Sequence, residues 1–153
     1  MAPDPGTIDR WRRADAALAK LFAIRARGVT ESLYARDSDL RDIVERNFQV
    51  VIEAAIDLAN ELIADRRWRT PSTAREAFEV LAENGALDAG SVSSFGGWVG
   101  FRNVIVHSYT EIKANLVVGF LNTELDDLQA RFLRLATACG FPPPSPSPPS
   151  SVP

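Results

Sequence analysis

Residues 102–109 read Arg-Asn-Val-Ile-Val-His-Ser-Tyr and contain the only histidine of this 153-residue chain. An imidazole ionises near neutral pH and suits proton transfer, and an arginine holds a phosphate through two parallel hydrogen bonds. Asn103 either orients the imidazole of His107 or binds a phosphate oxygen. In RNA the ribose 2′-hydroxyl is itself the nucleophile, so a base, an acid and a fixed cation such as Arg102 are sufficient. These residue types therefore predict cleavage of RNA without a metal.

Helical geometry separates the two most reactive side chains. Asn103 and His107 are four residues apart and share one face of a helix, whereas Arg102 and His107 are five apart and lie about 140° from each other. Either fraying near His107 or a second copy of the motif must bring them together. One histidine cannot be acid and base at the same moment, which favours a two-fold homodimer. The residues of this helix expected to face the core are Trp98, Phe101, Val104 and Ile105.

Each of these residues also has an ordinary structural interpretation. A lone histidine at the end of a helix often caps carbonyl groups or interacts with the helix dipole. Arg102 is then a surface or ion-pairing residue, and Tyr109 packs with its hydroxyl at the surface. The residue types alone leave both interpretations open.

The elements that must position the octapeptide all show helical spacing of apolar residues. The predicted helices cover residues 8–27, 40–65, 72–83, 95–107 and 113–138. Gly28 and Asn84-Gly85 are stop signals, and Ser38 or Asp39 is the expected N-cap of the long helix. The inner face of that helix includes Ile43. The pattern predicts an all-α, up-and-down bundle of four to five helices.

The rest of the sequence limits the possible domain organisation, cofactors and location of the protein. Residues 1–140 are expected to form one domain, and residues 141–153, rich in Pro and Ser, a disordered or polyproline II tail. The formal charge of −3 gives no global basic field. With one cysteine, Cys139, there is no disulfide within the chain, and we expect no metal and no cofactor. Glu53 and Asp57 interrupt the longest apolar run, so we expect no membrane span and a cytoplasmic location.

The octapeptide resembles the R-x4-H-x-Y motif of the HepT-like ribonuclease toxins of the HEPN superfamily. The resemblance continues in residues 53–60, in residues 76–85 and in the Gly100-Phe101 pair that leads into the motif, and it covers about residues 36–137. The Gly96-Gly97-Trp98 stretch departs from the Leu/Lys-rich sequence of the family.

The resemblance implies a metal-independent endoribonuclease toxin of a type VII-like toxin–antitoxin pair, acting as a homodimer across a cleft. Arg102, His107 and Asn103 would be catalytic. The implied partner is a MntA-like minimal nucleotidyltransferase antitoxin that transfers AMP to Tyr109, and an adduct there would compete for Arg102. Ser108 is a possible supporting residue. Glu53 and Asp57 either position the catalytic pair or form a solvated stripe.

Two other functions fit the same sequence. A non-catalytic helical binding subunit of a nucleotidyltransferase complex would use the bundle without RNA chemistry, and the net negative charge favours it mildly. A structural helical dimer is the third possibility. An intact Arg102–His107 pair favours the ribonuclease, because a pure binding module needs neither group.

Overall fold

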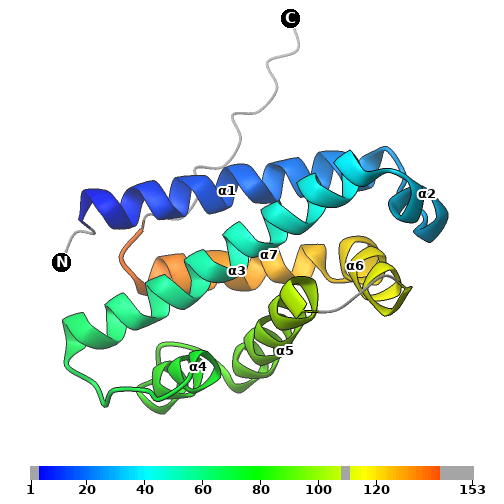
Figure 1. Ribbon diagram of the computed structural model, residues 1–153. Helices are drawn as coiled ribbons and strands as arrows, with labels where there is room; N and C mark the ends of the chain where they lie inside the picture. Colours follow the sequence, from blue (N-terminus) through cyan, green and yellow to red (C-terminus); the bar gives the residue numbers. More distant parts are fainter. Residues whose placement is uncertain (1–3, 108–110, 142–153) are drawn as a thin grey trace, which may run out of the picture.

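The computed structural model describes residues 4–107 and 111–141, and all regular secondary structure in that part of the chain is helical (Figure 1). The helices are, in chain order, α1 (Pro5–Ala26), α2 (Glu31–Arg36), α3 (Ser38–Arg66), α4 (Ala74–Glu83), α5 (Ala89–His107), α6 (Glu111–Thr123) and α7 (Leu125–Ala138). The all-α class predicted from the sequence is therefore confirmed. The structure has two more helices than the upper end of the predicted range of four to five.

The additional helices arise at two places where apolar spacing is a poor guide. The six-residue α2 is too short to show a period, and the Thr30 side chain, which accepts from the Leu33 N–H, caps it. The single helix expected over residues 113–138 is wrong, because it is divided at Glu124 into α6 and α7. Before the division, the Thr123 hydroxyl donates to the Gly119 carbonyl and the Asn122 amide donates to the Val29 carbonyl. Such side-chain bonds to backbone compete with continued helix.

The ends of α1, α3 and α4 show which helix boundaries the sequence marks. Gly28 and Gly85 adopt positive φ angles of 82° and 75° after α1 and α4, as their stop signals predicted. The N-cap of α3 is Asp37, whose carboxylate accepts from the Leu40 N–H at 3.1 Å, one residue before the expected Ser38 or Asp39. The other end of α3 is closed by Arg67 in the left-handed conformation, φ 58°, where no glycine marks the stop.

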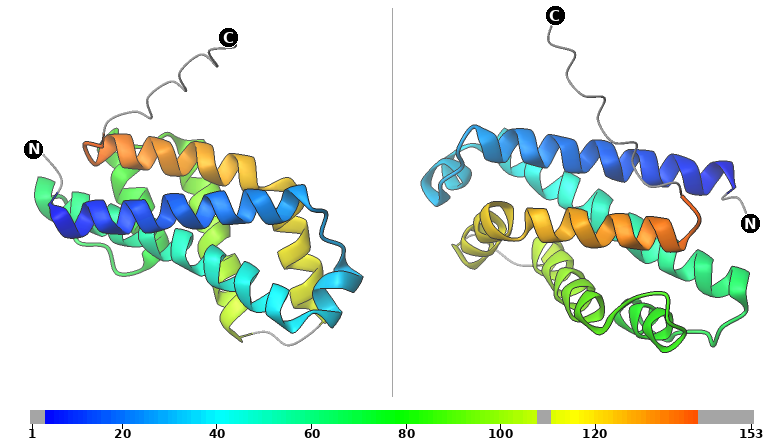
Figure 2. Two further views of the ribbon diagram at one scale, coloured as in Figure 1. Left: turned by 90° about the horizontal axis from the view of Figure 1, so that it is seen from above. Right: turned by 180° about the vertical axis from the view of Figure 1, so that it is seen from behind.

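Helices α1 and α3 lie side by side along most of their length, with α7 against both, and α4 and α5 pack below α3 (Figures 1 and 2). The core fills the space between these helices and is almost wholly apolar. Removal of this apolar surface from water is the main stabilising contribution to the fold. The prediction that Ile43 faces the core is wrong: its side chain is 46% exposed, because residues 44 and 48 turn the buried stripe of α3 to the other side.

Phe141, which follows α7, belongs to the packed part of the chain. Its ring stacks on Trp11 of α1 with centroids 5.3 Å apart, and the residue is buried. The expected tail otherwise lies outside the described residues. In the part of the chain that the structure describes, none of the helices has both the length and the apolarity that crossing a membrane requires.

Candidate active site

Helix α5 carries the predicted catalytic residues, and it begins six residues earlier than the sequence suggested. Three glycines in residues 96–100 lower intrinsic helix propensity, so the spacing placed the start near residue 95. In the structure Asp88 accepts from the Ser91 N–H, and Phe95 and Trp98 are buried on either side of the first glycines. Packing of large aromatic side chains offsets the cost of the glycines.

The rotation of α5 about its axis is fixed by Phe101 and Ile105, each 3% exposed. The Phe101 ring meets Phe48 of α3 edge-on at 5.1 Å and stacks on Phe120 of α6 at 3.9 Å, measured between centroids. These two positions and Trp98 face the core as predicted, whereas Val104 is only half-buried. Because successive residues are 100° apart, anchoring Phe101 turns the next two side chains outward.

Arg102 is half-buried and Asn103 is exposed, and the two side chains interact directly. The Arg102 guanidinium donates to the Asn103 amide oxygen at 3.3 Å. Asn103 therefore lies beside the cation that would hold a phosphate. His107 is exposed in the last turn of α5, one turn beyond Asn103.

The motif continues into residues 108–110, so Ser108 and Tyr109 lie outside the described residues. The next described helix, α6, is tied to α3 by an ion pair between Lys113 and Glu45. The Tyr34 side chain of α2 is buried beside this pair, and burial followed by the Glu45 carboxylate raises the pKa of its hydroxyl. Both helices that flank the 108–110 segment are thus anchored to the core.

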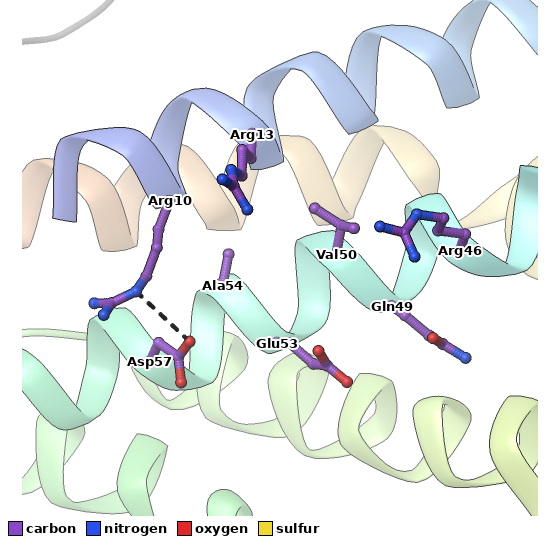
Figure 3. A pocket seen from close by; sticks show the side chains of 8 residues that line it. All are labelled: Arg10, Arg13, Arg46, Gln49, Val50, Glu53, Ala54 and Asp57. Carbon is purple, nitrogen blue, oxygen red and sulfur yellow. Dashed lines mark ion pairs between the residues drawn. The ribbon is translucent and has the colours of Figure 1, made fainter. Parts of the chain in front are cut away.

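Glu53 and Asp57 lie one turn apart on α3, and both are exposed. Asp57 faces Arg10 of α1 at 4.0 Å, and Glu53 lines the same stretch of surface (Figure 3). Both carboxylates, Arg102 and His107 lie in the part of the chain that the structure describes, and neither carboxylate forms a hydrogen bond or ion pair with Arg102 or His107. Of the two carboxylates, Asp57 pairs with α1, and Glu53 forms no ion pair or hydrogen bond within the described residues.

The sequence reasoning missed a polar groove between α1 and α3, here called the α1–α3 groove. Its lining residues are Arg10, Arg13, Arg46, Gln49, Val50, Glu53, Ala54 and Asp57 (Figure 3). The signal available in the sequence was the spacing of three between Arg10 and Arg13, and again between Arg46 and Gln49. That spacing puts each pair on one face of its helix, but only the packing of α1 on α3 brings the two faces together.

Comparison with known proteins identifies the family to which the chain is similar. The family model described as Ribonuclease HepT-like matches residues 15–135. The mRNA nuclease HepT of Shewanella oneidensis is 32% identical over 98 residues, which are 64% of this chain and 74% of that protein.

Two solved structures show the same fold. The tri-AMPylated Shewanella oneidensis HEPN toxin in complex with MNT antitoxin aligns with a TM-score of 0.76 at 24% identity, covering 88% of this chain and 99% of that one. A toxin–antitoxin structure with AMP-PNP gives a TM-score of 0.76 at 24% identity, with 87% and 99% covered. Because the family model spans well over half of its residues, the chain belongs to the Ribonuclease HepT-like family.

Proposed function

We propose that this protein is a metal-independent endoribonuclease and the toxin of a toxin–antitoxin pair. The observation that carries the proposal is the display of Arg102, Asn103 and His107 on the last turns of α5, held outward by the buried Phe101 and Ile105. The family membership and the relative named as an mRNA nuclease support RNA as the substrate.

The proposed chemistry assigns one role to each side chain. Arg102 binds the non-bridging phosphate oxygens and stabilises the charge that grows on them. His107 transfers the proton, either from the attacking 2′-hydroxyl or to the leaving 5′-oxygen. Asn103, already bonded to Arg102, orients the guanidinium or binds a phosphate oxygen. No step requires a metal, and we propose that cleavage persists in a chelator.

A homodimer would place the partner's His107 beside Arg102, which lies about 140° from the His107 of its own helix. Val106, between the catalytic residues, is 54% exposed, and Ile43 on α3 is 46% exposed. Large exposed apolar side chains of this kind mark contact surfaces when they gather. We propose that a second copy covers this end of α5 and brings its own His107 to the cleft.

The proposed control is AMP transfer to Tyr109 by a MntA-like nucleotidyltransferase antitoxin. The Shewanella structure is of a tri-AMPylated HEPN toxin with its MNT antitoxin, and this chain has the fold of that toxin. Tyr109 is two residues after His107. An anionic adduct at that distance would compete with RNA for Arg102 through charge and bulk.

The decisive experiment measures cleavage of RNA in EDTA by the purified protein and by its His107→Ala variant, together with growth on induced expression. We expect both cleavage and toxicity to disappear in the variant while its circular dichroism and melting temperature stay close to the parent. Because His107 is exposed, the substitution has little reason to unfold the protein. A folded variant that cleaves like the parent would refute the proposal and leave the non-catalytic binding subunit as the better explanation.

The dimer is tested by mixing two inactive variants, Arg102→Ala and His107→Ala, after joint unfolding and refolding. If a site takes Arg102 from one copy and His107 from the other, half of the dimers are mixed and each has one intact site. About a quarter of the parent activity then returns. No recovery would contradict a site shared in this way.

The proposed AMP transfer has its own test. Tyr109→Phe should escape the AMP-dependent mass increase that the antitoxin causes in the parent, and modification of that variant would contradict the assignment.

A further inference from the structure

We infer that the α1–α3 groove is a second RNA-binding site, which holds the phosphodiester backbone of the single strand that leaves the active site. The inference rests on the proposed ribonuclease function and extends it from the cleaved bond to the neighbouring nucleotides. It concerns residues outside the octapeptide, and Arg10 and Arg13 lie before residue 15, where the family match begins.

The groove gathers guanidinium groups from two helices. Arg10 and Arg13 reach it from α1, and Arg46 reaches it from α3, with Gln49 one turn further along α3 (Figure 3). Guanidinium groups bind phosphates through paired hydrogen bonds. Since charges are screened within about 8 Å at physiological ionic strength, the lining of the groove, with three arginines and two carboxylates, acts on a ligand more strongly than the overall charge of −3 does.

The two ends of the groove differ in available charge. At one end Arg10 forms ion pairs with Asp57 and Glu61, so its charge is already used to hold α1 on α3. At the other end Arg46 forms no ion pair or hydrogen bond within the described residues. Arg13 lies between them, one turn along α1 from Arg10 (Figure 3). Among the described residues its only ion pair is with Asp9 of its own helix, at 3.1 Å, and both side chains are more than half exposed. Such an exposed pair contributes little and is readily exchanged.

The helix that lines the groove also packs against the helix that carries the proposed active site. Phe48 of α3 touches Phe101 of α5. Gln49 and Arg102 are the next residues in the sequence, so the groove and the proposed catalytic arginine lie on two helices joined by this aromatic contact. On this proposal, a strand whose phosphate is held by Arg102 continues across the contact to Arg46 and Arg13.

The side chains next to the arginines suit a nucleic acid better than a simple anion. Gln49 and Glu53 offer amide and carboxylate groups that bond to the free edges of unpaired bases. Glu53 and Asp57 repel phosphate, so we expect the backbone to follow Arg13 and Arg46 rather than these carboxylates. We expect two phosphates to be held in the groove, one by each of these arginines.

The test compares the double variant R13Q/R46Q with the matched control R12Q/R36Q. Both remove two positive charges from exposed positions, and only the first pair lines the groove. A fluorescent oligouridylate is titrated at several salt concentrations, with His107→Ala present in every protein so that the probe stays intact. For single strands the slope of log K against log salt is about −0.7 per phosphate contact. The slope should therefore become shallower by about 1.4 in R13Q/R46Q alone, and at about 0.1 M salt binding should weaken roughly 25-fold.

A second measurement uses the same pair of variants with His107 intact. On an RNA long enough to reach the groove, R13Q/R46Q should raise KM at nearly unchanged kcat, and the control should change neither. An unaltered salt slope in R13Q/R46Q overturns the inference even if the parent cleaves RNA. If the parent binds RNA with the expected slope but does not cleave it, the groove stands and the proposed catalysis fails. A change in oligomeric state of R13Q/R46Q by light scattering, with the salt slope kept, would assign the groove to a protein interface instead.

Discussion

Phe101 connects the core to the proposed catalytic residues, and its replacement by leucine tests whether that connection matters. The ring forms two aromatic contacts, edge-on with Phe48 and stacked on Phe120. Aromatic pairs contribute about 0.5–1.5 kcal/mol each beyond their buried area. Phe101→Leu should therefore lower the free energy of unfolding by about 1–3 kcal/mol. In a chain of this size that corresponds to a melting temperature lower by about 2–12 °C.

Phe95→Leu is a closely matched control. Phe95 lies on the same helix, is 1% exposed and also forms two aromatic contacts, stacked on Phe78 at 4.4 Å and edge-on with Trp98 at 5.0 Å. The expected loss of stability is the same, but the site is two turns away from Arg102. Both variants are compared well below their melting temperatures.

The two variants should differ in RNA cleavage. A displacement of about 1 Å at a catalytic group can reduce the rate about a hundredfold, and of the two substituted residues it is Phe101 that adjoins Arg102 and helps to fix the rotation of this end of α5. We expect a large fall in kcat/KM for Phe101→Leu and a value close to the parent for Phe95→Leu. Equal losses in both variants, or full activity in Phe101→Leu, would refute the idea that Phe101 positions the site.

Two further predictions follow from shifted ionisations. Burial raises the pKa of Cys139 from 9.0 to about 12, and its thiol lies 3.6 Å from the Leu58 carbonyl, so the native thiolate fraction near pH 8 should be about a thousandfold below that of the unfolded chain. Iodoacetamide should label Cys139 only after denaturation, and rapid native labelling would show that the burial is wrong. Hydrogen bonds from Ser72, and then from Arg69, lower the pKa of Glu76 from 4.5 to about 2. The stability that the ionised carboxylate adds to the folded protein is therefore present above its unfolded pKa and is lost as the pH falls through its folded pKa. Glu76→Gln should therefore melt below the parent at neutral pH and together with it near pH 2, and a difference that persists in acid would contradict the assignment.

The extent of the fold that could be predicted depended on where the sequence carries a local signal. Gly28 and Gly85 stop their helices because a positive φ costs glycine nothing. Arg67 adopts the same conformation after α3 without such a marker. The early start of α5 was missed for the opposite reason, since its glycines are tolerated where Phe95 and Trp98 are buried in the core. In α5, tertiary packing overrides propensity.

Much of α5 could be predicted from the sequence, because Phe101 and Ile105 are large apolar residues at helical spacing. The groove could not, because its arginines come from positions 10, 13 and 46 and meet only through the α1–α3 packing. Ile43 was placed inside on the same apolar spacing and is exposed.

The regularity of α5 sharpens the argument for a second copy. The sequence left two ways to unite Arg102 with His107, which are about 140° apart on an ideal helix: fraying near His107, or the same motif from another chain. The structure keeps α5 helical through His107, so fraying does not occur before the imidazole. The guanidinium is held beside Asn103, and the imidazole lies a turn further on with the exposed Val106 between them. A partner that covers Val106 would bring its own His107 toward this Arg102, and the apolar contact and the catalytic pair would then form together.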